Sequence, residues 1–370
     1  MRAVGVRPLE PTREQEELRD AVRALLARHP GHAAWAPLTA QIGAAALAVP
    51  EEYGGLGCGP AEVGVVMAEL GRALSPVPYL GSAVLTVAAL LASGDREACA
   101  KHLPHLAEGT AVGALAWAEA PQGGWEADGL SARAEPAGAD WLLTGTKRYV
   151  LAGPAEPSLL LAFARTDSAG AGATGRPGPL GLFELLAPPA AFTVRSTMDR
   201  TRPLAELTLD RTPARLLSAD GAGVLARVRD LACTALAAEQ AGAAARALEA
   251  TVRYAKERVQ FGRPIGSFQA VKHRLADLHT AVEGARSLAL AAAAADAAPD
   301  LAAAAKSACS EAFAYVAGEM IQLHGGIGIT WEHEAHEYFK RAHGSALLFG
   351  SPAAHRERLA ARLGFLPAAG

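Results

Sequence analysis

The spacing of hydrophobic residues changes twice along this chain of 370 residues. Before about residue 112, and again after about residue 223, apolar side chains recur at the spacing of amphipathic helices. Between these regions, short apolar runs separated by turn residues predict strands. We therefore expect a helical domain in residues 1–112, a β domain in residues 113–222 and a helical bundle in residues 223–370.

The last region predicts the longest helices, in segments 225–258, 267–295 and 301–324, followed by a shorter pair. Their faces are rich in Ala and Gly, which allows close helix packing, and the short joints favour an antiparallel bundle. In the middle region, strands are expected in segments 130–153, 157–166, 180–187, 192–197 and 205–210. The Gly-rich stretch 166–181 has the composition of a flexible surface loop.

Composition narrows the functional classes. Hydrophobic residues make up 51% of the chain, enough for a large core, and the formal net charge of −3 provides no basic field for nucleic acid. The four cysteines form no CxxC pair, which indicates a reducing compartment. The N-terminus lacks the apolar core of a signal peptide, and the longest apolar stretches are too short to span a bilayer. We expect a cytoplasmic protein without membrane or nucleic-acid partners.

Three segments resemble known motifs but do not indicate a functional site. The Gly-rich pieces "GGLGCG" and "GGIGIT" do not join a strand to a helix in a βαβ unit, which argues against a dinucleotide loop. His333 and His336 are three residues apart, one short of the zinc-protease spacing, and no third ligand is evident. No metal site is therefore expected.

The turn between the first two bundle helices, "RYAKERVQFGRPIGSFQAVKHRLADL", is more informative. A plain helical turn explains its Gly and Pro residues, but not why Arg258, Phe261, Phe268 and Gln269 gather there. An Arg beside a helix N-terminus suits a phosphate, and an aromatic residue beside it suits a planar ring.

This stretch resembles the C-terminal domain of the acyl-CoA dehydrogenase flavoproteins. "QLHGGIGITWEHEAHEYFKRA" resembles the second motif of that family, while "VPEEYGGLG" and "LPHLAEGTAVGALAWAE" match its N-terminal features in order. The resemblance covers nearly the whole chain. It implies a mostly α fold with a central β domain: an N-terminal helical domain, a middle β-barrel domain and a C-terminal four-helix bundle.

The resemblance also implies non-covalently bound FAD, in a homotetramer or in a heterotetramer with a related subunit. By position, the diphosphate and adenine would meet Arg258 and Phe261, with further contacts from Phe268 and Gln269. The stretch that lies along the cofactor from a partner subunit is matched by Gln322, Gly325 and Gly326. Tyr149 falls where the family usually has a Trp against the flavin. The usual Thr-Glu-Pro reads Ala118-Glu119-Ala120, so the hydroxyl donors to the flavin are missing.

The catalytic base is the open question. The family reaction removes the C2 proton of an acyl thioester, which needs a carboxylate in a dry site. The usual Glu position is Phe349 here, followed by Gly350 and by Ser351, whose hydroxyl is expected near a cofactor phosphate. A second known position aligns with Ala232, and neither side chain can take a proton.

Glu239 is the remaining candidate base, because it lies seven residues after Ala232 on nearly the same helix face. A lone carboxylate among small apolar residues must be paired or hold a proton. The alternatives are a structural Glu bonded to a neighbouring helix and a surface Glu.

Three functions follow from the resemblance. The first is an FAD-dependent dehydrogenase of lipid metabolism that oxidises an acyl-CoA or acyl-carrier-protein thioester to the 2,3-enoyl thioester. It would use Glu239 as base and pass electrons to an electron-transfer flavoprotein-like acceptor. The second is a non-catalytic partner subunit of a heterotetrameric acyl-CoA dehydrogenase. The third, a relative that uses reduced flavin with oxygen, has no residue in its favour.

Overall fold

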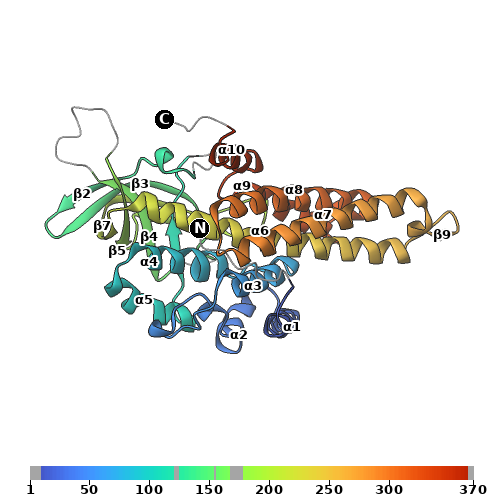
Figure 1. Cartoon of the computed structure of the whole chain (residues 1–370), viewed down its shortest axis with the longest axis horizontal. Helices are drawn as coiled ribbons and strands as arrows, with labels where there is room; N and C mark the ends of the chain where they lie inside the picture. Colours follow the sequence, from blue (N-terminus) through green and yellow to red (C-terminus); the bar gives the residue numbers. More distant parts are fainter. Residues whose placement is uncertain (1–9, 121–124, 154–155, 167–177, 366–370) are drawn as a thin grey trace.

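The computed structural model describes residues 10–120, 125–153, 156–166 and 178–365. Helices from the N-terminal part and a β barrel lie side by side, and a long helical bundle projects away from both (Figure 1). The prediction of a mostly α fold with a central β domain is confirmed. Most of the Gly-rich stretch expected as a surface loop lies outside the described residues.

In Figure 1 the N-terminal helices lie beneath the barrel and beneath the part of the bundle next to it. Thr12 begins the first of them, because its hydroxyl accepts from the Gln15 N–H while the Gln15 side chain accepts from the Thr12 N–H. A seven-residue π-helix, Leu80–Thr86, is buried at every position and continues directly into the fourth helix. The helices are α1 Arg13–Arg28, α2 Trp35–Ala40, α3 Pro60–Arg72, α4 Val87–Ser93 and α5 Arg96–Glu108.

The strands form a closed barrel. The strands are β1 Gly113–Ala116, β2 Arg133–Ala137, β3 Asp140–Val150, β4 Leu159–Thr166, β5 Leu180–Leu185, β6 Ala191–Arg195 and β7 Leu204–Ser218. The ring runs β2–β3–β7–β5–β4 and closes where β4 pairs with β2. β1 adds to β4 in parallel, and β6 pairs with the first part of β7. Closure leaves these ring strands without a free edge.

The bundle contains the predicted long helices. These helices are α6 Gly221–Glu257, α7 Gln269–Ala294, α8 Pro299–His324, α9 Ala335–Leu347 and α10 Pro352–Arg362. A two-strand hairpin, β8 Val259–Gln260 and β9 Arg263–Pro264, closes the far end of the bundle between α6 and α7. No described helix is both long and apolar enough to cross a membrane.

Two glycines bring α3 against the middle of α6. A Cβ atom at Gly71 would lie 2.1 Å from the Glu239 carbonyl oxygen, and one at Gly242 would lie 2.1 Å from that of Ala68. Only glycine permits this approach of the two backbones. The contact fixes the N-terminal helices beside the stretch of α6 that carries Glu239.

Glu184 on β5 connects the barrel to α5, since its carboxylate accepts from Lys101 at 2.9 Å and from Arg215 at 3.1 Å and lies 2.8 Å from His102 Nε2. Burial opposes its charge, but the hydrogen bonds from His102 and Lys101 outweigh burial and lower the pKa of Glu184 to about 2. Because this pKa is below its unfolded value of 4.5, the stabilisation is complete above about pH 4.5 and is lost as pH falls toward 2.

Glu184→Gln should therefore lower the free energy of unfolding by about 2 kcal/mol at pH 7, and by much less at pH 3. Urea unfolding at the two pH values measures the difference. Glu135→Gln, which breaks an exposed pair with Arg211, is the control and should have little effect. An equal loss at both pH values for Glu184→Gln would contradict the assignment.

Candidate flavin-ring place and cofactor contacts

Phe349 occupies the expected position of the base, in the turn that follows α9. Its backbone has a φ of +61°, and Gly350 follows with +112°. The ring is 2% exposed, stacks on Trp117 with a centroid distance of 5.5 Å, and contacts the Trp125 ring edge-on at 5.3 Å. The position is thus filled by an aromatic side chain packed from two sides.

Trp125 lies in contact with Tyr149, which was expected against the flavin, and with Phe349, at the expected position of the base. Its ring centroid is 6.1 Å from that of Tyr149 and 5.3 Å from that of Phe349. The indole Nε1 donates to the Leu347 carbonyl at 3.1 Å, and Trp117 Nε1 donates to the Trp125 carbonyl at 3.1 Å. A flavin ring between Tyr149 and Phe349 would have to displace this indole. With the side chains in these positions, there is no room for a flavin ring between Tyr149 and Phe349 in this chain.

Sequence reasoning missed Trp117 and Trp125. Trp117 directly precedes the Ala118-Glu119-Ala120 stretch that departs from the family pattern, and Trp125 follows it closely. Two indoles beside a stretch without the expected hydroxyl donors are the signal that could have identified them. Glu119 instead forms a buried pair with Lys147 at 2.5 Å and accepts from the Ser131 N–H at 2.6 Å. Burial raises the pKa of Glu119, but Lys147 outweighs it and the net pKa is lowered.

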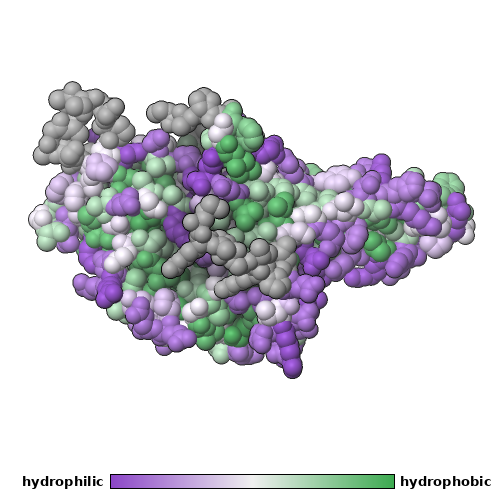
Figure 2. Space-filling model, in the orientation of Figure 1, coloured by the Kyte–Doolittle hydropathy of each residue, from purple (hydrophilic) through white to green (hydrophobic). Residues whose placement is uncertain are grey.

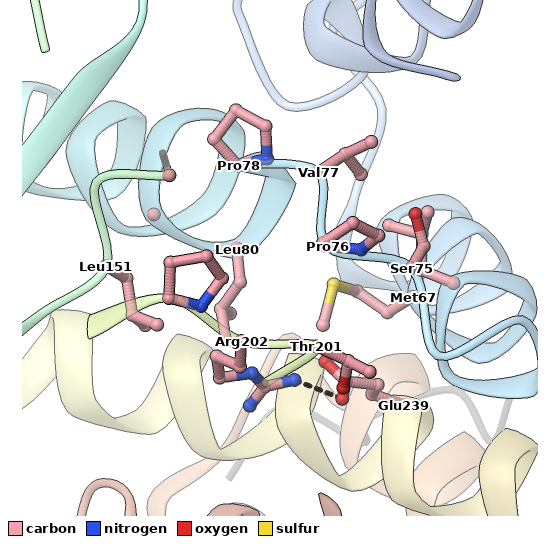
Figure 3. Close-up of a pocket in the computed structure, with 14 residues that line it drawn as sticks. Met67, Ser75, Pro76, Val77, Pro78, Leu80, Leu151, Thr201, Arg202 and Glu239 are labelled. Carbon is pink, nitrogen blue, oxygen red and sulfur yellow. Dashed lines mark hydrogen bonds and ion pairs between the residues drawn. The ribbon is translucent and has the colours of Figure 1, made fainter. Parts of the chain in front are cut away.

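Glu239 is buried, 3% exposed, and its Oε1 atom is bonded by two guanidinium groups. Arg341 of α9 donates to it at 2.8 Å, and Arg202, in the connection between β6 and β7, also pairs with it (Figure 3). Arg341 further pairs with Asp199 at 2.8 Å and donates to the Thr201 carbonyl at 2.9 Å. We name Glu239, Arg202, Arg341 and Asp199 the junction network, because they join α6, α9 and the barrel.

The cavity beside the junction network is small, about 30 Å³. Its walls are mainly apolar and come from α3, the segment before α4, and the end of β3; they include Met67, Leu70, Val77, Leu80 and Leu151. This volume is room for about one or two water molecules. These surroundings match the alternative of a structural carboxylate, while catalysis by Glu239 stays a prediction.

The residues expected at the diphosphate and adenine lie at the far end of the bundle, beside β9 in Figure 1. Phe261 has a φ of +53°, and its side chain is 92% exposed. Its ring meets Phe268 edge-on at 6.1 Å, and the Arg263 guanidinium lies 4.0 Å from the centre of the Phe268 ring. Arg258 is exposed where α6 ends, and Gln269 Nε2 lies 3.0 Å from His273 Nε2. The structure thus brings these four predicted residues together and adds Arg263, which the sequence analysis missed.

Gln322, Gly325 and Gly326 lie where α8 ends. Both glycines are exposed, Gly325 has a φ of +62°, and a Cβ atom on either would meet nothing within 4 Å. The preceding His324 is buried, stacks on Tyr254 and lies against His333, each with a centroid distance of 4.3 Å. This stack fixes the start of a backbone turn that is open to a ligand or to another chain.

The remaining expected residues have local partners. The Ser351 hydroxyl accepts from the Ala354 N–H at 3.2 Å and caps α10, so its predicted phosphate contact remains a prediction. His336 packs edge-on against the Trp331 ring, with centroids 4.7 Å apart. Among the described residues no group of three His, Cys, Asp or Glu side chains could hold a metal ion.

The expected cofactor contacts therefore form two separate groups. Tyr149 and Phe349 lie where the barrel meets the bundle, while Phe261 and its neighbours lie at the opposite tip of the bundle (Figure 1). Figure 2 shows a mainly hydrophilic surface along the projecting bundle.

Comparison with known proteins identifies the family of this chain. The pattern described as "Acyl-CoA dehydrogenase, C-terminal domain" matches residues 220–364, and that of the N-terminal domain matches residues 12–110. The chain is 41% identical over 359 residues to the acyl-CoA dehydrogenase IpdE2 of Mycobacterium tuberculosis, covering 93% of this chain and 95% of the relative. The IpdE2 of Mycolicibacterium smegmatis is 37% identical over 365 residues, covering 95% and 99%.

A solved structure is similar over its whole length. It is a chain of the ChsE4-ChsE5 complex from Mycobacterium tuberculosis, with a TM-score of 0.86 and 28% identity, covering 98% of this chain and 100% of that chain. Fold, motifs and full-length similarity agree, and this chain belongs to the acyl-CoA dehydrogenase family.

Proposed function

We propose that this chain is the partner subunit of a heteromeric acyl-CoA dehydrogenase. In this proposal a second, related subunit supplies the catalytic base and encloses the flavin ring. This chain supplies contacts to the other end of the same FAD. The complex as a whole oxidises an acyl-CoA thioester and passes electrons to a flavoprotein acceptor.

The observation that carries the proposal is the Trp125 indole in contact with both Tyr149 and Phe349. A catalytic subunit needs this space for the flavin ring and a carboxylate in place of Phe349. Three aromatic rings in mutual contact, two of them donating hydrogen bonds, form a filled core rather than a hydrated site.

The bundle tip supports the second half of the proposal. The Phe261 side chain is 92% exposed, so its apolar surface stabilises nothing in the isolated chain. Burial against a ligand or a partner surface would remove this apolar surface from water. Phe261, Phe268, Arg258 and Arg263 combine aromatic rings with positive charge, the chemistry that suits an adenine and a diphosphate. Because this tip is remote from the barrel of its own chain, the cofactor it would bind is held by another subunit. The ChsE4-ChsE5 complex gives a precedent for assembly of two different chains within the family.

The alternative is an active single-chain dehydrogenase with Glu239 as base. A base must reach the proton on the C2 atom of the substrate. Glu239 Oε1 is held by Arg202 and Arg341, and the cavity beside it has a volume of about 30 Å³, which is too small for an acyl chain. We therefore favour a structural role for Glu239 and the partner-subunit function for the chain.

The first prediction concerns flavin binding. The chain purified alone should be colourless and should not take up stoichiometric FAD, whereas a complex with the related subunit should contain one FAD per pair. Absorbance and flavin fluorescence measure both. A yellow isolated chain that is bleached by an acyl-CoA would establish the single-chain alternative.

Variants at the tip test which end of the cofactor this chain binds. In the complex, Phe261→Ala or Arg258→Ala should each weaken the affinity for FAD by about tenfold. This corresponds to a loss of about 1.4 kcal/mol of binding free energy. Tyr149→Phe in the same chain is the matched control and should leave retention unchanged. Loss of FAD with the control but not with the tip variants would reverse the assignment.

A third prediction separates the two roles of Glu239. Glu239→Gln leaves Arg202 and Arg341 buried without their shared carboxylate, so the free energy of unfolding should fall by about 3–5 kcal/mol. Chemical denaturation measures it, with Glu249→Gln, which breaks a half-exposed pair with Arg72, as control. A catalytic role predicts the opposite: unchanged stability and complete loss of turnover.

A further inference from the structure

The turn that carries Phe349 is held by side chains from three other parts of the chain. The last carbonyls of α9 and those of the turn lack helical partners, as at every helix end. Ala346 and Gly350 oxygens accept from Lys306, at 3.0 and 3.2 Å, and the Leu347 oxygen accepts from Trp125 at 3.1 Å. The Phe349 oxygen lies 3.0 Å from His355 Nε2.

Lys306, in the middle of α8, is the charged member of this set. Its side chain is fully buried, and Nζ lies 2.9 Å from the Ser310 hydroxyl as well as near the two carbonyls. None of the ion pairs formed by the described residues includes Lys306. A buried ammonium without a carboxylate is costly. Its three N–H groups are here matched by the Ser310 hydroxyl of α8 and by two carbonyl oxygens, one in the last turn of α9 and one in the turn after it.

His355, on α10, completes the arrangement. Because a carbonyl only accepts, Nε2 carries the proton and the ring donates to the Phe349 oxygen. Burial and the nearby Lys306 and Arg358 charges lower the pKa of His355 to about 3, so the ring is neutral at ordinary pH. A Cβ atom at Gly350 would lie only 3.0 Å from Nε2, so the turn and the imidazole fit closely.

We propose that Lys306 and His355 are positioning residues that hold this turn so that the Phe349 ring stays packed on Trp117 and Trp125, and that the N–H groups of Lys306 latch the turn. The proposal rests on the partner-subunit function, because only there does a turn without a catalytic base have a role. The experiment that tests the turn does not depend on that function. Phe349 and Gly350 both have positive φ, a backbone conformation that is unfavourable for a residue with a side chain such as Phe349. The turn keeps this conformation because several donors converge on it.

The latch depends on pH. Burial lowers the pKa of Lys306 to about 8 from 10.5. Above that value the neutral amine keeps two N–H donors for three oxygens, so one of these oxygens loses its donor and the contacts of the turn change. Since the folded pKa is below the unfolded one, the neutral amine is less costly to bury than the ammonium, and the free energy of unfolding rises between about pH 8 and 10.5. The titratable and charged side chains around the latch are Cys233, Asp230, Arg229 and Arg202, with Cys309 on α8 and His355 and Arg358 on α10.

Near-UV circular dichroism of the full chain measures the latch, because Trp117 and Trp125 pack on Phe349. The wild-type tryptophan signal should change with a midpoint near pH 8 while the melting temperature does not fall. Lys306→Met should lose this midpoint and, already at pH 7, give the spectrum of Phe349→Leu. Lys272→Met, at an exposed lysine of α7, is the control.

His355 provides a second, independent variant should Lys306→Met not fold. His355→Ala should increase acrylamide quenching of tryptophan fluorescence about twofold, and His355→Gln, which keeps a donor for the Phe349 oxygen, should restore the wild-type value. An unchanged tryptophan spectrum in either Lys306→Met or His355→Ala would overturn the proposal. These measurements need no flavin and no second subunit. The proposal about the turn can therefore fail while the proposed function holds, and the proposed function can fail while the turn behaves as expected.

Discussion

The arrangement of this protein depends on the buried charges of the junction network. One carboxylate of α6 accepts from two arginines, one on α9 and one in the connection between β6 and β7, and Asp199 balances the second positive charge. Charges of this kind are tolerated in a core only when each is paired, so the network fixes the relative positions of three distant segments. The glycine contact between α3 and α6 places the N-terminal helices beside Glu239, a member of the same network.

The aromatic cluster lies on the other side of the same junction. Trp117 and Trp125 come from the barrel side and Phe349 from the end of the bundle, so their packing requires the domain positions that the junction network fixes. Within one fold the same place can thus be either a flavin site or a dry core. A few side chains decide between them: a Phe where a Glu would be needed, and the Trp125 indole in the space that a flavin ring would need.

Much of the fold could be predicted from the sequence because its signals are local. The 3.6-residue period of Ala-rich segments located the long bundle helices, and turn residues between apolar runs located the strands. The gathering of Arg258, Phe261, Phe268 and Gln269 at one turn was predictable for the same reason. The contacts of Glu239 could not be predicted from the sequence, because Arg202 and Arg341 are 37 and 102 residues away in the chain. Helix periodicity indicated that Glu239 faces inward, but only the three-dimensional structure shows which groups meet it.

The exposed Phe261 at the bundle tip has an evolutionary consequence. A surface residue of this kind is usually free to vary, because its replacement seldom harms the chain that carries it. If Phe261 contacts a cofactor enclosed by another subunit, its selection acts through the product of a different gene. Substitutions at the tip are then constrained by that partner. Substitutions of Phe349 and the two indoles are constrained only by packing within their own chain.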